Sequence, residues 1–246
     1  MNGQISGSGL ASVVCVHGWA CEGGQFHEMS GALEREFRIY CPDLPGHGGT
    51  PLEGFVPGFE AYADAVANFI RDHKLIRPVL LGHSMGGVLA LMASRRLEVR
   101  AVINLDGSMP AAAHSLAGQN AIRDWLDLPD FRERLARALR EGFFLPHERD
   151  ARCEAIIHTM CSAPEAVLRF LPEQVHYLNT EAILAGVKAP VLYIGAAKPR
   201  FDVVCSRAML PQLRCEQISE GGHFLHVYQC ARVVDIVREF LRSCRD

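Results

Sequence analysis

The sequence predicts an α/β fold in which a mostly parallel sheet is flanked by helices. Short apolar runs rich in β-branched residues alternate with longer amphipathic stretches, which is the pattern of repeated βαβ units. The first of these runs is almost continuously apolar, as expected of a strand that is covered on both faces. At 246 residues, the chain is long enough for one such domain with a large buried core.

Taken in order, the runs predict six strands separated by helices and loops. A segment rich in proline and glycine follows the second strand and predicts a loop there. The expected strands are residues 10–16, 37–41, 78–81, 99–105, 190–194 and about 214–218. The expected helices that pack on them are residues 25–36, 60–72, 85–95 and 231–241.

The alternation stops in the middle of the chain. Residues 110–180 contain no strong strand signal, only helix-like pieces separated by four prolines. This pattern predicts a core made of residues 1–108 and 186–246, interrupted by a helical cap, or lid, over residues 109–185.

Composition excludes several classes of protein. A net charge of −3, with acidic and basic residues interspersed, is not typical of a protein that binds nucleic acid. The nine cysteines are scattered and odd in number, which indicates reduced thiols in a compartment such as the cytoplasm. The first nine residues do not resemble a signal peptide, and no apolar run is long enough to cross a membrane. We therefore expect a cytoplasmic monomer or homodimer that has no membrane or nucleic-acid partner.

A nucleophile elbow is the most specific local signal. Strand residues 78–81 lead into Gly82-His83-Ser84-Met85-Gly86 and then into a helix, which is the strand–turn–helix context that G-x-S-x-G requires. The glycines are needed because the nucleophile lies on a strained turn where a side chain would collide with neighbouring backbone. A glycine-rich turn that merely joins strand and helix is the alternative. We assign Ser84 as the nucleophile.

A histidine late in the chain supplies the general base. His223 follows two glycines, between the last strand and the last helix, so it lies at the carboxyl edge of the sheet. Imidazole suits proton transfer because its pKa lies near neutrality. His226 is a competitor, but the preceding glycines favour His223.

Four segments together resemble the markers of the α/β-hydrolase superfamily, in the right order along the chain. They are His17-Gly18-Trp19, Asp43-Leu44-Pro45-Gly46-His47-Gly48, the elbow with Gly87, and Gly222-His223-Phe224. The resemblance implies an α/β-hydrolase fold with a helical lid insertion. It also implies that Asp43 shapes backbone near the oxyanion loop and transfers no proton. Most members carry an antiparallel hairpin before the first marker, but few residues precede it here, so we expect a reduced sheet of about six strands.

The resemblance also implies an oxyanion hole and part of a substrate pocket. The donors would be the backbone N–H groups of Trp19 and Met85. The Trp19 side chain is either a wall of the pocket or core. The expected pocket residues are Trp19, His83, Trp125, Phe143 and Phe144. The alternative for Trp125, Phe143 and Phe144, which lie at helical spacing, is that they form the core of the lid.

The acid of the triad is expected in an unusual place. In the family it follows the strand at 190–194, but here that slot holds Lys198, which would oppose an imidazolium. Asp202 lies four residues later and could reach only if the loop folds back. The other known solution puts the acid after the preceding strand, where Asp106-Gly107 stands. We assign Asp106, with Asp202 as the alternative and a turn-forming Asp-Gly as the non-catalytic explanation.

These residues predict a serine hydrolase that cleaves a carboxylic ester or thioester of a small to medium apolar substrate through an acyl-enzyme. The mechanism needs no metal or organic cofactor. Two other activities could use the same site: cofactor-free dioxygenation of the 3-hydroxy-4-oxoquinoline type, which the acid's position and the oxyanion-loop tryptophan resemble, and C–C bond hydrolysis. A hydrolase-like binding protein without turnover is the alternative of another class.

Overall fold

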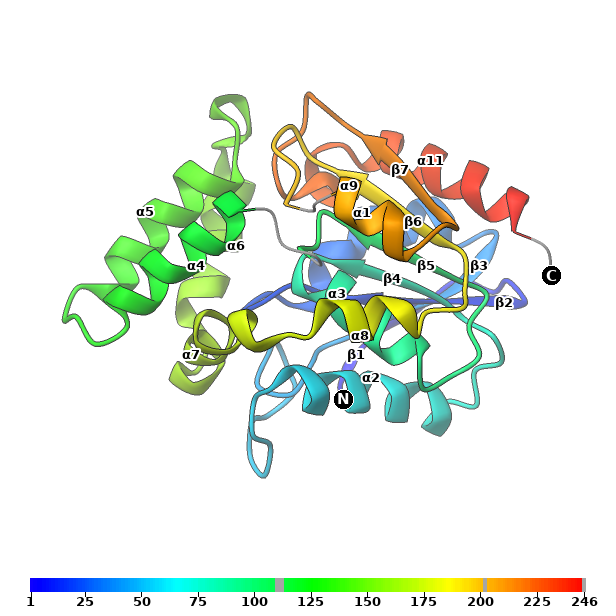
Figure 1. The fold of residues 1–246 in the computed structure, drawn as a ribbon, viewed down its shortest axis with the longest axis horizontal. Helices are drawn as coiled ribbons and strands as arrows, with labels where there is room; N and C mark the ends of the chain where they lie inside the picture. Colours follow the sequence, from blue (N-terminus) through cyan, green and yellow to red (C-terminus); the bar gives the residue numbers. More distant parts are fainter. Residues whose placement is uncertain (109–112, 201–202, 245–246) are drawn as a thin grey trace.

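The computed structural model describes residues 1–108, 113–200 and 203–244. Its centre is a seven-stranded sheet with the order β1-β3-β2-β4-β5-β6-β7 (Figure 1). Strand β1 pairs antiparallel with β3, and every other pair is parallel. The strands are β1 (Gly3–Ser6), β2 (Ala11–Val16), β3 (Phe37–Pro42), β4 (Val79–His83), β5 (Ala101–Leu105), β6 (Val191–Gly195) and β7 (Leu213–Gln217).

Helices cover both faces of the sheet. A separate group of helices follows β5 and precedes β6 in the sequence. The α-helices are α1 (His27–Leu33), α2 (Phe59–Asp72), α3 (Met85–Ser94), α4 (Ala113–Trp125), α5 (Phe131–Phe143), α6 (Ala151–Ser162), α7 (Glu165–Gln174), α8 (Thr180–Ala185), α9 (Val203–Met209), α10 (Leu225–Tyr228) and α11 (Cys230–Ser243). Three short 3₁₀ segments are η1 (Gly23–Phe26), η2 (Pro146–Glu148) and η3 (Val175–Tyr177).

The sheet is the middle of three layers, which explains the nearly continuous apolar runs in its strands. Along β2, Val14 and Val16 pack into the core on the side of α2 and α3, whereas Val13 and Cys15 pack into the core beneath α1 and α11. All ten residues of α3 are buried. Because both faces of the central strands are covered, these strands have no polar face.

The six strands predicted from sequence are all present, with ends shifted by one or two residues. The seventh, β1, is one strand more than the expected sheet of about six. Its residues lie at the sheet's edge and are mostly exposed, so they show no apolar pattern by which to recognise a strand. Backbone pairing with Phe37–Pro42 of β3 defines it instead.

The segment between β5 and β6 forms helices only, within the residues described. Helices α4, α5, α6 and α7 lie together to one side of the sheet, and α8 returns along α3 (Figure 1). We call residues 113–185 the helical insertion. Within the described ranges, no helix is both long enough and apolar enough to cross a membrane.

Candidate active site

The sequence-predicted residues meet at one edge of the sheet. Ser84 follows β4, Asp106 follows β5, and His223 lies beyond β7. Arg200, which sequence reasoning did not single out, lies beyond β6. Because these strands are parallel, the loops at their carboxyl ends converge, which is where open α/β sheets bind ligands.

Ser84 has the strained backbone expected of a nucleophile elbow. Its φ of 55° and ψ of −120° lie outside the regions that non-glycine residues favour. A Cβ on Gly82 would lie 2.0 Å from the carbonyl oxygen of Gly86, and one on Gly86 would lie 2.0 Å from that of Val16. The turn can therefore close only with glycine at both positions. The N–H of Ser84 donates to Leu105 O at 2.9 Å and ties the elbow to β5.

The imidazole of His223 is joined to Asp106. Nδ1 of His223 donates to Oδ2 of Asp106 at 2.7 Å, and both side chains are 1% exposed. This bond leaves Nε2 of His223 as the nitrogen with a lone pair. Nε2 is buried and has no hydrogen-bond partner among the described residues, Ser84 included. Such bonds are often absent before substrate binds.

Asp106 lies in a turn that its neighbours shape. Its φ is 49°, a left-handed conformation that aspartate tolerates better than most residues. Oδ1 of Asn104 accepts from the N–H of Gly107 at 2.8 Å and closes this turn.

Several donors surround the Asp106 carboxylate. Oδ1 accepts from Tyr193 Oη at 2.9 Å and from the N–H groups of Ala196 and Arg200 at 3.2 and 3.3 Å. Burial raises the pKa of Asp106 to about 6, although the charge of Arg200 and these donors lower it. The carboxylate is therefore mostly ionised at neutral pH and can hold the imidazolium of His223.

Two buried histidines beside the elbow are neutral. Burial, followed by the charges of Arg200 and His226, lowers the pKa of His223 well below its ordinary value. Burial likewise lowers the pKa of His83, whose Nε2 donates to His223 O at 3.0 Å. A neutral His223 at rest is the form that accepts a proton.

The expected oxyanion donors, Trp19 and Met85, belong to the loop after β2 and to the start of α3. A Cβ on Gly18 would lie 3.2 Å from Ser84 Cβ, so the loop after β2 touches the elbow. In this loop Ala20 N–H donates to His47 Nε2 and Cys21 N–H to Gly18 O, while that of Trp19 finds no partner among the described residues. Met85 begins α3, where an N–H has no acceptor inside the helix.

Two polar residues, buried His17 and partly buried Asp43, hold this loop. Nε2 of His17 accepts from the N–H of Leu44 at 2.9 Å, and burial lowers the pKa of His17 to about 4. The carboxylate of Asp43 accepts from the N–H groups of Gly23 and Gly49. Asp43 therefore shapes the loop as the resemblance implied.

The helical insertion fixes the His223 loop from above. The N–H of His223 donates to Phe143 O at 2.7 Å. Glu148, 1% exposed, accepts from the N–H of Gly222 through Oε1 and from that of Leu145 through Oε2, both at 2.9 Å. Nothing in the sequence distinguishes Glu148 from the charged residues around it.

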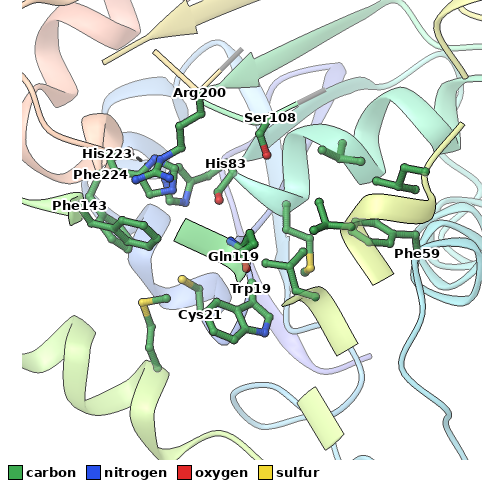
Figure 2. Close-up of a pocket in the computed structure, with 17 residues that line it drawn as sticks. Trp19, Cys21, Phe59, His83, Ser108, Gln119, Phe143, Arg200, His223 and Phe224 are labelled. Atoms are coloured by element: carbon green, nitrogen blue, oxygen red, sulfur yellow. Dashed lines mark hydrogen bonds between the residues drawn. The ribbon is translucent and has the colours of Figure 1, made fainter. Parts of the chain in front are cut away.

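Ser84 is one of the residues that line a cavity at this edge of the sheet. Figure 2 shows the lining in close-up. Of the expected pocket residues, Trp19, His83 and Phe143 line the cavity, but Trp125 and Phe144 do not. The expectation that Trp125 and Phe144 line the pocket is therefore corrected, because both side chains pack elsewhere. Phe144 stacks on the ring of Phe224 at 5.0 Å, and Trp125 packs against the hydrophobic core. The lining also includes Cys21, Phe59, Met85, Val88, Ser108, Gln119, Met160, Leu171, Val175, Leu178, Arg200, His223 and Phe224.

The alternative acid, Asp202, lies outside the described residues. Within the described part of the chain, no group of three or more histidine, cysteine, aspartate or glutamate residues could hold a metal ion.

Known proteins resemble the chain over nearly its whole length. The model of the "Alpha/beta hydrolase family" matches residues 13–236. The chain is 29% identical to the pimeloyl-[acyl-carrier protein] methyl ester esterase of Aromatoleum aromaticum, over 92% of this chain and 98% of that protein. Two solved structures share the fold. An esterase from Thermogutta terrifontis has a TM-score of 0.83 at 23% identity, covering 100% of this chain and 94% of that one. The enol-lactonase from Burkholderia xenovorans has a TM-score of 0.84 at 15% identity, covering 98% and 96%.

Proposed function

The chain belongs to the alpha/beta hydrolase family, and from this membership and its site we propose that it is a serine hydrolase that cleaves a carboxylic ester. The observation that carries the proposal is the bond from Nδ1 of His223 to Asp106, beside a serine on a strained elbow. That bond leaves Nε2 of His223 ready to take a proton. The relative in Aromatoleum aromaticum, whose name describes a methyl ester esterase, supports ester cleavage as the reaction.

The reaction proceeds in two halves. Ser84 Oγ attacks the ester carbonyl carbon while Nε2 of His223 takes the hydroxyl proton, and Asp106 stabilises the imidazolium. The tetrahedral intermediate then collapses, and His223 returns the proton to the departing alcohol. Water, deprotonated by His223, attacks the acyl-serine in the same way and releases the acid and Ser84.

Two backbone N–H groups receive the negative charge of each tetrahedral intermediate. These are the donors of Trp19 and Met85, and each is expected to contribute roughly a hundredfold or more in rate. The N-terminus of α3 adds a favourable dipole at the same point.

The cavity supports a small to medium substrate that is largely apolar. Most of its lining is aliphatic, aromatic or sulfur-containing, as in pockets that bind small molecules. We extend the proposal to the helical insertion, which acts as a lid because Phe143, Met160 and Leu171 in it form part of that lining. Thioesters of similar size are substrates of the same chemistry.

Hydrolysis of p-nitrophenyl acetate and butyrate tests this function. We expect Ser84→Ala to lower kcat/KM by about 10³-fold or more, because the nucleophile is lost. Ser8→Ala, which changes an exposed serine outside the cavity lining, serves as the control. Full activity of Ser84→Ala would contradict the acyl-enzyme mechanism. Oxygen uptake with a 3-hydroxy-4-oxoquinoline that survives Ser84→Ala would favour dioxygenation instead.

A further inference from the structure

Arg200 brings a positive charge to the wall of the cavity. Its guanidinium carbon lies 4.4 Å from the centre of the Phe143 ring, and Nη2 donates to Gly142 O at 3.1 Å. Figure 2 shows the side chain reaching toward His223 and Phe143. The side chain is only 14% exposed. These two contacts are with the helical insertion and hold the guanidinium in position.

Among the described residues, the surroundings of Arg200 match its positive charge only in part. Among the described residues that line the cavity, it is the only arginine or lysine, and no aspartate or glutamate is present. Ser108 and Gln119, which also line the cavity, are polar but uncharged. Burying a guanidinium among such groups is costly unless an anion with suitable acceptors compensates it.

Among the described residues, Asp106 is the carboxylate that pairs with Arg200, but its oxygens already accept other hydrogen bonds. Oδ1 accepts from three donors, and Oδ2 accepts from Nδ1 of His223. Nε of Arg200 lies 3.8 Å from Oδ2, too far for a hydrogen bond, and has no acceptor among the described residues. Asp106 thus offsets the charge of Arg200 without satisfying its donors.

The proximity of Arg200 to Asp106 also affects the proposed chemistry. Asp106 must stabilise the imidazolium of His223, yet Arg200 opposes that imidazolium. A second negative charge near Arg200 would restore the balance, and the cavity is where a substrate could supply it. The planar guanidinium fork matches a carboxylate.

We propose that the substrate carries a free carboxylate that Arg200 binds beside the ester that is cleaved. The substrate class is then a half-ester of a dicarboxylic acid, or an ester whose alcohol part bears the carboxylate. The inference rests on the proposed serine hydrolase function and narrows its substrate. The apolar lining holds the hydrocarbon portion between the two groups.

Matched pairs of esters test the inference. For a carboxylate on the acyl side, monomethyl glutarate is compared with methyl valerate. For one on the alcohol side, acetoxyacetate is compared with propyl acetate. We expect wild-type kcat/KM to favour the anionic member of one pair by about ten- to hundredfold, as a charge-assisted contact provides. The favoured pair identifies the side that carries the carboxylate.

Variants of Arg200 locate the effect. Arg200→Gln should abolish the preference for the anionic ester, and Arg200→Lys should retain part of it, because lysine keeps the charge without the fork. Arg137→Gln removes an exposed arginine outside the lining and should leave the preference intact. For each variant, kcat/KM with the anionic ester is divided by kcat/KM of the same variant with the neutral ester. This ratio cancels the effects of Arg200 on His223.

Glutarate provides a test that needs no variant. It should inhibit wild-type hydrolysis of p-nitrophenyl acetate competitively, and glutaramide should not. Equal wild-type rates within both pairs, or an unchanged preference in Arg200→Gln, would overturn the role of Arg200. If Ser84→Ala no longer hydrolyses the neutral ester, the serine hydrolase function stands whether or not Arg200 binds a carboxylate.

Discussion

Asp106 and His223 lie 117 positions apart in the sequence and are joined by a 2.7 Å hydrogen bond between two nearly fully buried side chains. The bond sets which ring nitrogen of His223 carries the proton. It supports the proposal that the acid follows β5, the strand beside that of the proposed nucleophile, and not β6. The loop after β6 contributes differently: the N–H groups of Ala196 and Arg200 donate to Asp106.

Asp106→Asn tests the identity of the acid. Asparagine keeps the shape of the carboxylate, but its amide can stabilise the wrong tautomer of His223 and carries no charge. We expect kcat to fall by about 10³- to 10⁴-fold with little change in KM. Asp202→Asn is the matched control and should change kcat by no more than about threefold. The reverse result, with the large loss in Asp202→Asn, would assign the acid to Asp202.

The pH profile tests the influence of Arg200. Activity requires an ionised Asp106 and a neutral His223, so wild-type kcat/KM should decline as the pH falls through about 6. Arg200 lowers the pKa of both groups. Removing its charge therefore raises both pKa values. As the pH is lowered, Arg200→Gln should begin to lose activity at a higher pH than the wild type does. An acid limb at unchanged or lower pH would show that Arg200 does not act on this pair.

Glu148 should couple the helical insertion to the His223 loop. Glu148→Gln leaves one acceptor for the two N–H groups of Gly222 and Leu145 and turns an amide NH₂ toward the other. We expect unfolding free energy to fall by about 1–3 kcal/mol. We also expect kcat to fall about tenfold, because the proposed base is held less firmly. Urea denaturation and ester kinetics measure the two effects. The control is Glu141→Gln, at an exposed position on α5. If the two variants behave alike, Glu148 does not position the loop.

His47 should make stability depend on pH. Its Nε2 accepts from Ala20 N–H, and burial lowers its pKa from 6.5 to about 3. Below pH 6.5 the unfolded chain takes up a proton that the folded chain refuses, so stability is lost as the pH falls from about 6.5 toward 3. His47→Gln keeps an acceptor without titrating. Its unfolding free energy, followed by urea denaturation from about pH 7 to 5, should decline less steeply, by up to about 1.4 kcal/mol per pH unit. His176→Gln, at an exposed position, should keep the wild-type slope.

The parts of the molecule that could be predicted from sequence depend on local patterns. The elbow around Ser84 requires glycine at a fixed spacing for steric reasons, and the buried strands are short apolar runs. Such signals do not depend on which distant segment packs against them. The proposal that Asp106 is the acid was likewise reached from a local signal, because the cation Lys198, which is exposed, cannot replace the acid.

The parts that could not be predicted depend on contacts between distant segments. Glu148 and Arg200 are charged residues in charged surroundings, and only folding reveals that one is buried and the other nearly so. Likewise, Phe143 and Phe144 are adjacent and chemically identical, yet only Phe143 lines the cavity. Strand β1 is defined by its pairing with β3 and by no pattern of its own.

Covalent labelling of Ser84 tests the proposed mechanism most directly. Wild-type protein is treated with a fluorophosphonate and examined by mass spectrometry of the intact chain and of its peptides, with Ser84→Ala and His223→Ala alongside. We predict one adduct per chain, on Ser84, with no adduct in Ser84→Ala and much slower labelling in His223→Ala. A wild-type protein that hydrolyses esters but carries no adduct on Ser84 would contradict the role of Ser84 as nucleophile.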